Sequence, residues 1–504
     1  MSAGEASAVA LDADVAIVGA GPVGLVLGVQ LAQRGRSVVI LEQWSQAYPL
    51  PRAVHFDHEV GRILQSCGIG EEVRAVSEPA EIYEWRNAQG TTLLRFGRVG
   101  TARSGWPFSS MFCQPEVEAQ LEARARSLPM LDLRRGVRVE RIEPRADHVV
   151  VECTSGTLRT SYVVGCDGAN STVRNLLGVT MDDRGFFYDW LIVDVILDEP
   201  RVFDPINLQI CDPLRPTTAV SGGPGRRRWE FMRLPDERLE ELREESTAWK
   251  LLAPWDVHPD NARLERHAVY TFAARVADTW QVGRTFLAGD AAHQMPPFAG
   301  QGMCAGIRDA ANLAWKLDLV LAGRAGPELL ATYDEERRPS AVAAVEFSIE
   351  LGKVICVPDP AEAKARDDAM AAAVTDEVSE VADLPGISSG VVSSGSKCAG
   401  ELFPQGNLGG RWFDDAHGAG WRFVTVDPAA ADLDSSLVDW LDSIGGAVVD
   451  VGGAAPDLEA WFLANDVQWA LQRPDFCIYG TAVDVGGAAK LVDELRRRLV
   501  SPRR

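Results

Sequence analysis

The sequence predicts an α/β protein with a parallel-sheet domain, an inserted and mostly antiparallel sheet, and a small C-terminal α/β unit. Three observations favour this class. At 504 residues the chain is too long for one hydrophobic core. It opens with a strand, a glycine turn, a helix and a second strand, which is a βαβ beginning. Residues 186–271 are rich in β-branched and aromatic residues broken by Pro and Gly turns, as in antiparallel sheets.

The composition, 46% apolar and 24% charged, is that of an ordinary folded protein. A net charge of -22 would repel phosphate backbones and anionic lipid, so we expect neither nucleic acid nor membrane as a partner. The first residues, MSAGEASAVALDAD, have no basic region before an apolar run, and no later stretch stays apolar for about 18 residues. We therefore expect a cytoplasmic protein. The nine cysteines include no CxxC pair, which argues against a disulfide framework or a metal site.

The N-terminal unit is predicted as a strand at 14–18, a helix to about residue 34 and a strand at 37–41. Between strand and helix, Gly19-Ala20-Gly21-Pro22-Val23-Gly24 fits the GxGxxG pattern. Gly19 permits the tight turn, Gly21 lets the backbone approach a pyrophosphate, and Gly24 lets helix and strand pack closely. Glu42 ends the second strand, where its carboxylate can accept hydrogen bonds from an adenosine ribose. This fingerprint predicts a Rossmann-like dinucleotide site but does not separate FAD from NAD.

Two further strands run into motifs of their own. The strand at 161–165 leads into Cys166-Asp167-Gly168-Ala169-Asn170-Ser171, and the strand at 284–288 leads into Gly289-Asp290-Ala291-Ala292-His293. A long helix follows at about 301–321, where apolar residues recur at helical spacing.

The remaining chain divides into a linker and a small module. Residues 358–396 change to an acidic, alanine-rich run followed by GISSGVVSSGS, which is linker composition. Strands at 420–426, 447–451 and 475–479 then alternate with helices, two of them at 435–444 and 487–499, which predicts a compact α/β unit.

The GAGPVG, CDGANS and GDAAH sites, in this order and spacing, resemble the set that marks class A flavoprotein aromatic hydroxylases, typified by para-hydroxybenzoate hydroxylase and phenol hydroxylase. The resemblance covers about residues 12–350. Within this family the chain is most similar to 3-(3-hydroxyphenyl)propionate hydroxylases. That similarity rests on Pro51-Arg52-Ala53, Gln114-Pro115, Cys211-Asp212-Pro213, Glu230-Phe231-Met232 and Arg308-Asp309-Ala310.

The resemblance implies an FAD-dependent monooxygenase that uses NAD(P)H and O2 to hydroxylate a phenolic ring through a flavin C4a-hydroperoxide, on a hydroxyphenylpropionate-like substrate. It implies an FAD-binding domain formed by residues 12–82, 105–185 and 272–350, and a substrate-binding domain formed by 83–104 and 186–271. Residues 358–396 would be the linker. Residues 397–504 resemble a thioredoxin-like tail with a structural or homodimer-forming role.

Carried over from the family, the residues at the cofactor are Gly19, Gly21, Gly24, Glu42, Arg52, Gln114, Asp167, Asp290, Gly300, Gly302 and Met303. Asp290 would hydrogen-bond the ribityl chain of FAD. The helix that begins near Gly302 would direct its N–H dipoles at the reduced, anionic flavin. Pro297 lacks an N–H and could face the flavin edge and the substrate. The chain departs from the family at Cys304, where asparagine is usual and a thiol cannot make the amide's hydrogen bonds.

A base near the substrate would help, because a phenol becomes more electron-rich when it loses its proton. His55 is the first candidate and Asp57 the second, since alternate residues of an extended segment share a face. The alternative is that His55 is a structural, hydrogen-bonded histidine.

We expect the substrate to be contacted by residues of the antiparallel-sheet segment and by the loop before the helix at about 301–321. Arg215 could fix a substrate carboxylate through paired hydrogen bonds, or it could be a solvated arginine beside a proline turn. The candidates for the ring pocket, some of which could be ordinary core, are Tyr188, Trp190, Trp229, Phe231 and Phe298.

Two other functions stay open at this point. One is a flavoenzyme of the same fold that acts on a polyketide or antibiotic by hydroxylation, epoxidation or Baeyer-Villiger oxidation, because pocket residues decide among these reactions. The other is a non-catalytic flavin-binding scaffold.

Overall fold

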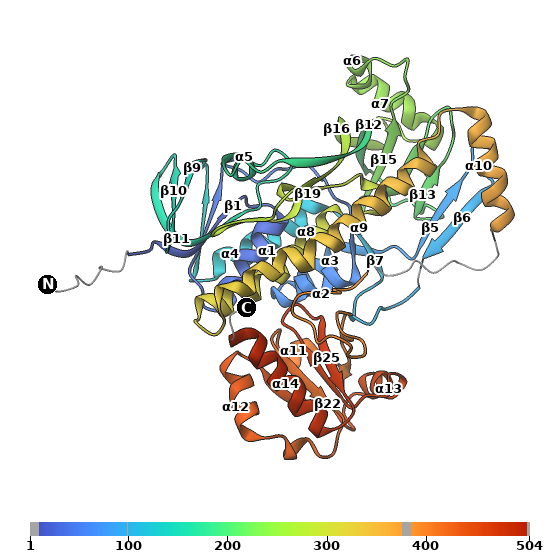
Figure 1. Ribbon diagram of the computed structural model, residues 1–504. Coiled ribbons are helices and arrows are strands. Elements are labelled where there is room, and N and C mark those ends of the chain that lie inside the picture. Colours follow the sequence, from blue (N-terminus) through green and yellow to red (C-terminus); the bar gives the residue numbers. More distant parts are fainter. Residues whose placement is uncertain (1–9, 98, 375–384, 501–504) are drawn as a thin grey trace.

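The computed structural model describes residues 10–97, 99–374 and 385–500. They form a mixed α/β fold with two eight-stranded sheets, a smaller C-terminal sheet and the helices that cover them (Figure 1). This confirms the predicted α/β class with both parallel and antiparallel sheets. No helix within the described residues is long and apolar enough to cross a membrane.

The first sheet is parallel at its centre. Its order is β17 (Gln281–Val282), β18 (Thr285–Leu287), β11 (Gly156–Gly165), β1 (Ala13–Val18), β2 (Val38–Glu42) and β8 (Leu131–Arg135), with β10 (Val149–Cys153) and β9 (Val139–Pro144) branching from β11. Strand β1 pairs in parallel with both β2 and β11, and β11 pairs in parallel with β18. The carboxyl ends of these strands meet at one edge, so the three glycine-containing motifs that follow them lie together.

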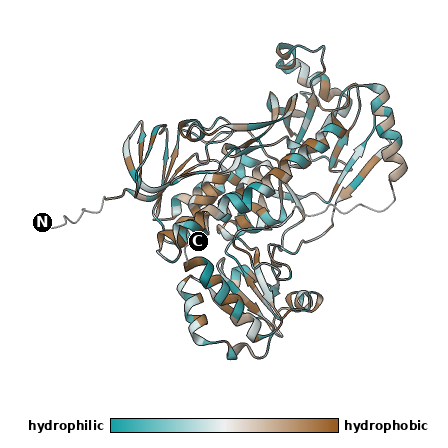
Figure 2. Ribbon diagram, in the orientation of Figure 1, coloured by the Kyte–Doolittle hydropathy of each residue, from teal (hydrophilic) through white to brown (hydrophobic). Residues whose placement is uncertain are grey.

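Helices pack against this sheet and against one another. They are α1 (Pro22–Gln33), α2 (His58–Ser66), α3 (Gly70–Ala75), α4 (Gln114–Ser127), α5 (Thr172–Leu176), α8 (Gly302–Leu321) and α9 (Thr332–Ile355), with 3-10 turns η2 (Gly289–Ala291), η3 (Pro297–Ala299) and η4 (Pro327–Ala331). Helix α1 is apolar on nearly every side because it packs between the sheet, α4 and α8. Figure 2 shows hydrophobic residues gathered in these central elements.

The second sheet is mostly antiparallel. Its order is β19 (His293–Gln294), β16 (Ala262–Ala277), β12 (Met181–Leu197), β15 (Arg226–Met232), β14 (Thr217–Ser221), β13 (Asn207–Ile210), β5 (Ile82–Arg86) and β6 (Thr92–Gly97). The outer face packs against α6 (Leu239–Leu242), α7 (Glu245–Leu252) and η1 (Ala253–Trp255). The inner face turns toward the first sheet. A separate small sheet joins β3 (His55–Asp57), β7 (Ser109–Phe112) and β4 (Ser77–Pro79).

Part of the predicted linker is helical. Helix α10 (Pro360–Ala373) begins after Asp359, whose carboxylate accepts hydrogen bonds from the amides of Ala361 and Glu362, both at 2.9 Å. Alanine is the best helix former and proline suits the first helical position, so this run folds as a helix. It packs beside β6, and residues 375–384 of the linker lie outside the described residues.

The C-terminal unit has a four-stranded sheet of order β23 (Ala447–Asp450), β22 (Arg422–Thr425), β24 (Trp469–Gln472) and β25 (Ile478–Ala482). Its other elements are β20 (Asn407–Leu408), β21 (Arg411–Trp412), α11 (Phe413–His417), η5 (Ala430–Asp432), α12 (Ser435–Ser443), α13 (Pro456–Ala464) and α14 (Val485–Val500). Strand β24 was not predicted.

Buried ion pairs join this unit to α8 and α9. Figure 1 shows the unit, in orange and red, below the rest of the molecule. Arg473 donates to Glu336 of α9 at 2.6 Å, and Lys316 of α8 lies 2.8 Å from the same carboxylate. Burial acts to raise the pKa of Glu336, but the charges of Arg473 and Lys316 lower it to about 2.

Candidate active site

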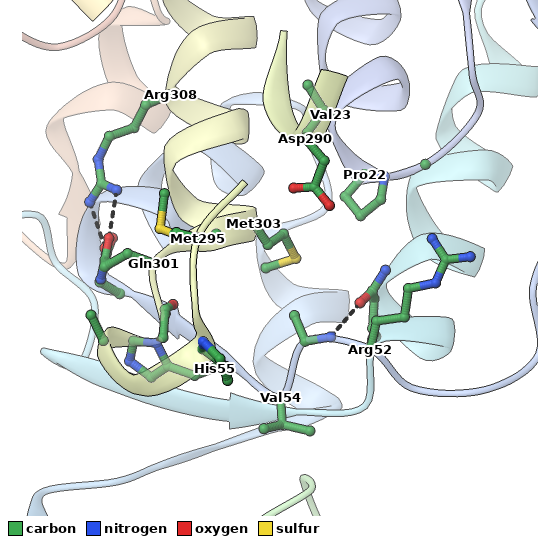
Figure 3. Close-up of a pocket in the computed structure, with 18 of the residues that line it drawn as sticks. Pro22, Val23, Arg52, Val54, His55, Asp290, Met295, Gln301, Met303 and Arg308 are labelled. Carbon is green, nitrogen blue, oxygen red and sulfur yellow. Dashed lines mark hydrogen bonds and ion pairs between the residues drawn. The ribbon is translucent and has the colours of Figure 1, made fainter. Parts of the chain in front are cut away.

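A cavity of about 1550 Å³ lies between the carboxyl edge of the first sheet and the inner face of the second. Ordinary small-molecule pockets measure roughly 300–1,000 Å³, so this one has room for a dinucleotide and a second molecule. Figure 3 shows residues from several separate elements around one space, among them Arg52, His55, Asp290 and Met303.

The β1–α1 turn is closed on the protein side and open on the cavity side. Gly19 has φ +107°, and a Cβ there would lie 2.4 Å from the carbonyl oxygen of Cys166. A Cβ on Gly24 would lie 2.1 Å from the Gly19 oxygen. A Cβ on Gly21 would meet no atom within 4 Å and would begin to fill the cavity. This cradle at the N-terminus of α1 fits the pyrophosphate of a dinucleotide.

Glu42 and Gln114 shape the wall beyond this turn. Glu42 Oε2 accepts from the Ala20 amide and Oε1 from the Trp44 amide, both at 2.9 Å. Gln114 Oε1 accepts from the Ala53 amide at 2.6 Å. Both side chains line the cavity and hold backbone segments beside it.

Arg52 also lines the cavity, with its guanidinium 4.4 Å from the centre of the Tyr48 ring.

Asp167 lines the cavity but is used to build its own turn. Its carboxylate accepts from the Ser171 hydroxyl at 2.5 Å and from the Val173 amide at 3.0 Å. Ser171 in turn caps α5 through the Arg174 amide. The carboxylate therefore fixes the CDGANS turn against the cavity.

Asp290 projects into the cavity, where its side chain is exposed. Desolvation by the surrounding protein raises its pKa, while the charges of His293 and Arg52 act to lower it. The carboxylate makes no hydrogen bond within the described part of the chain. An acceptor placed in this way fits a polyhydroxyl chain such as the ribityl of FAD.

The approach to α8 forms the next wall. Pro297, Phe298, Gly300, Gly302 and Met303 all line the cavity. Gly300 has φ +63°, and a Cβ there would lie 2.7 Å from Nδ1 of His55. Gly302 and Met303 begin helix α8, so its positive end faces the cavity, and no acidic residue in its first turn offsets that charge. The Sγ of Cys304 is buried 3.7 Å from the Gly300 oxygen, where it packs beneath this loop.

His55 lies on β3 with Nδ1 3.1 Å from the carbonyl oxygen of Gly300. A carbonyl only accepts, so this contact requires the proton on Nδ1 and leaves a lone pair on Nε2 of the neutral ring. Burial lowers the pKa of His55, while the charge of Asp57 acts to raise it. The imidazole is therefore mainly neutral at neutral pH, as a proton acceptor must be.

Asp57 holds His55 in place through the backbone. It caps α2 by accepting from the Val60 amide at 3.1 Å, and it pairs with Arg308 of α8 at 2.5 Å. Burial acts to raise the pKa of Asp57, but the charge of Arg308 holds it well below its ordinary value. This permanent pairing favours a positioning role for Asp57.

The aromatic side chains that line the cavity differ from most of those predicted. Within the described residues they are Trp44, Tyr48, Tyr83, Phe96, Phe108, Tyr270, Phe272, Phe298 and Phe347. Of the predicted set, only Phe298 is among them. Tyr188 and Trp190 lie on the inner face of the second sheet behind this lining, and the Trp190 ring lies 5.5 Å from that of Phe298.

Trp229 and Phe231 point away from the cavity, which corrects the prediction. They belong to the outer core with Leu191 and Leu252. Successive residues of a strand alternate between faces, so the inner positions of β15 are Arg228 and Glu230 instead. The sequence did hold a signal for this: polar residues alternate with apolar ones along β15, which indicates that one face of the strand borders a polar cavity.

The prediction that Arg215 clamps a substrate carboxylate is also corrected. Arg215 Nη1 donates to Glu237 at 2.7 Å and to the Met232 carbonyl at 3.0 Å, and Nη2 pairs with the same carboxylate. Arg215 does not line the cavity. Its charge is neutralised by Glu237, 22 residues along the chain.

Comparison with known proteins agrees with this geometry. The family model described as FAD binding domain matches residues 12–348. A probable NADH-specific resorcinol 4-hydroxylase of Rhodococcus jostii (strain RHA1) is 38% identical over 96% of this chain and 94% of its own length. A 3-(3-hydroxy-phenyl)propionate/3-hydroxycinnamic acid hydroxylase of Mycobacterium sp. (strain JLS) is 34% identical over 94% of this chain and 89% of its own length.

Among solved structures, the flavin-dependent monooxygenase PieE, in complex with FAD and substrate, has the same fold. Its TM-score is 0.79 at 21% identity, covering 97% of this chain and 99% of PieE.

Proposed function

The chain belongs to the FAD binding domain family, and from this premise we propose which residues hold the cofactor and which act on the substrate. The protein is an FAD-dependent monooxygenase that hydroxylates a phenolic ring and uses NAD(P)H as electron donor. When bound, FAD supplies electron transfer from NAD(P)H and the activation of O2.

We propose that the first sheet and its helices form a discontinuous FAD-binding domain, made of residues 12–82, 105–185 and 272–350. The second sheet would be an inserted substrate-binding domain, made of 83–104 and 186–271. Residues 397–504 would be a thioredoxin-like module. Support comes from the strand pairing, because β5 and β6 join the sheet of residues 181–277 although they lie far away in sequence. A homodimer is a further proposal, tested by sedimentation.

The cofactor site is proposed at the carboxyl edge of the first sheet. Gly19, Gly21 and Gly24 shape the turn that would receive the pyrophosphate. Glu42 would face the adenosine ribose, and Asp290 the ribityl hydroxyls. Other residues proposed near the cofactor are Arg52, Gln114, Asp167, Gly300, Gly302 and Met303, all of which line the same cavity.

His55 is proposed as the base that takes the phenolic proton, and its contact with Gly300 carries this proposal. The Gly300 carbonyl holds the proton on Nδ1, so that Nε2 is free to accept one. Pro297 would fix the loop that presents Gly300 without adding a competing N–H donor. Phe298 and the neighbouring aromatic rings would exclude water around the substrate ring.

An assay of NADH and NADPH oxidation against a panel of phenols, with products identified by mass spectrometry, tests the function. We expect phenols to stimulate oxidation and to gain one oxygen atom. Oxidation without oxygen insertion, or the absence of stimulation by any phenol, would overturn the proposal.

A further inference from the structure

One turn of the C-terminal unit, at residues 473–477, reaches the active-site cavity. Asp475 and Cys477 of this turn line the same cavity as His55. Leu402 lines it as well, and it forms an antiparallel bridge with Cys477. The C-terminal unit therefore supplies part of the wall around the proposed site of hydroxylation.

Phe476, within this turn, packs outside its own unit. Its side chain is fully buried in the large hydrophobic core that contains the first sheet, whereas Phe462 belongs to a core of the C-terminal unit. The guanidinium of Arg62, on α2, lies over the Phe476 ring, 4.3 Å from its centre. Arg62 is also buried, and Asp414 accepts from it at 2.6 and 2.9 Å. A desolvated guanidinium is attracted to an aromatic face, so this contact ties the turn to α2.

The backbone of Phe476 has a conformation that a bulky side chain disfavours. Its φ is +66°, in the left-handed region that glycine adopts freely. Such a conformation persists only where the surrounding contacts hold it. The Phe476 amide donates to the Arg473 carbonyl at 3.0 Å, and the Phe476 carbonyl accepts from the Phe403 amide at 2.9 Å. Contacts of the ring and of the backbone thus hold the turn in one shape.

Asp475, the residue before Phe476, binds the other helix. Its Oδ2 accepts from Asn312 Nδ2 at 3.0 Å and from Trp315 Nε1 at 3.2 Å, and both donors lie on α8. Arg473 lies 2.6 Å from the same oxygen and neutralises its charge. Two adjacent residues of the turn therefore contact two different helices, α2 and α8.

These two helices hold the surroundings of the proposed base. Helix α2 begins directly after Asp57, on the strand that carries the base, and the first residues of α8 line the cavity. Near these ends Arg308 of α8 pairs with Asp57 and with Glu59 of α2, both at 2.5 Å. The turn joins the helices a second time at Arg62 and Asn312, about one helical turn further along each.

We propose that the turn at residues 473–477 is a positioning element of the active site, which clasps α2 to α8 and closes the cavity against water, so that NADH oxidation stays coupled to hydroxylation. This inference rests on the proposed function. Oxidation chemistry of this kind needs a site from which water is excluded, and a loosened wall would admit it. NADH, O2 and a proton would then give NAD+ and H2O2, and no oxygen atom would enter the ring.

Phe476→Leu tests the clasp, because it removes the ring under Arg62 and keeps a buried apolar side chain. Hydrogen–deuterium exchange of the FAD-loaded protein should become about tenfold faster in peptides of α2 and of the first half of α8, since a desolvated cation–π contact is lost. Product formed per NADH consumed should fall, with the difference recovered as H2O2. Phe476→Gly suits the left-handed backbone and should give the same two results even if Phe476→Leu fails to fold.

Phe462→Leu is the matched control, because Phe462 is an equally buried phenylalanine of the same unit that does not line the cavity. It should lower thermal stability and leave both the exchange of α2 and α8 and the product per NADH unchanged. The inference is overturned if either quantity keeps its wild-type value in both Phe476 variants, or if Phe462→Leu changes both equally. If the wild type hydroxylates no phenol, the proposed function fails, and the exchange measurement alone decides whether the turn clasps the helices.

Discussion

Replacing His55 by alanine removes the proposed base and leaves the cavity otherwise intact. His55 touches the cofactor loop through one contact, Nδ1 to the Gly300 oxygen, so the loss should fall mainly on proton removal. Cofactor binding should persist, because Gly21 and Asp290 lie on other elements. FAD content of the purified variant checks this point.

The size of the effect follows from the ionisation of the substrate. A phenol with a pKa of about 10 is ionised to only ~0.1% at pH 7, so without a base the rate falls by up to about 1,000-fold. The pKa of His55 is lowered from its ordinary 6.5 by burial, so the wild-type rate should be level at neutral pH and fall in acid as the imidazole gains a proton. The variant should instead gain rate with each rise in pH, up to about pH 10.

The assay measures product formation and NADH oxidation between about pH 5 and 10. His267→Ala is the matched control, because His267 Nε2 also contacts a backbone carbonyl, that of Arg243 at 3.1 Å, but lies outside the cavity. An unchanged pH profile of product formation in His55→Ala would refute the reasoning.

Three further predictions address the cofactor cradle, the docked module and the corrected clamp. Gly21→Val fills the open side of the cradle and should weaken FAD binding by at least about tenfold, or 1.4 kcal/mol. Glu336→Gln leaves Lys316 buried without its carboxylate partner, whereas Arg473 keeps Asp475, and it should lower the free energy of unfolding by about 3–5 kcal/mol. The folded pKa of Glu336 is about 2 against an ordinary 4.5, so its contribution is complete above about pH 4.5 and lost as the pH falls toward 2. Arg215→Gln should leave kcat/KM for every phenol within about twofold, since its partner is Glu237.

Gly486→Ala in α14 should retain FAD, measured by absorbance, and full occupancy in Gly21→Val would contradict the cradle. Asp368→Asn breaks an exposed pair and should leave thermal unfolding unchanged; equal stability of Glu336→Gln and wild type would contradict the docking role. If Arg215→Gln raises KM for 3-(3-hydroxyphenyl)propionate but not for phenols without a carboxylate, Arg215 does bind the substrate carboxylate and the reasoning is wrong.

The glycine turn at the carboxyl edge of the first sheet could be predicted because the residues that form it are close together in the sequence. Gly19 and Gly24 lie within six residues, between a strand and a helix, and each close contact they permit follows from that context. The parallel pairing that gathers Asp167 and Asp290 beside them follows from the βαβ pattern.

The substrate side could not be predicted in the same way. Trp229 and Phe231 could be placed only if one knew which side chains of β15 point to the cavity. A shift of one residue moves every side chain of a strand to the opposite face, so the sequence alone does not decide this. Arg215 and Glu237 are joined by folding alone, since no local pattern pairs them. Residues 360–373 were predicted as part of a linker but form helix α10, because alanine favours the helix more strongly than the acidic residues disfavour it.

Turnover under ¹⁸O₂ tests the central claim most directly. The FAD-loaded protein is incubated with NADH and resorcinol, and the product is analysed by mass spectrometry. FAD-dependent hydroxylation of a phenolic ring predicts a product that carries one ¹⁸O atom, formed in proportion to the NADH consumed. NADH consumption that yields only hydrogen peroxide, or a product whose new oxygen comes from water, would contradict it.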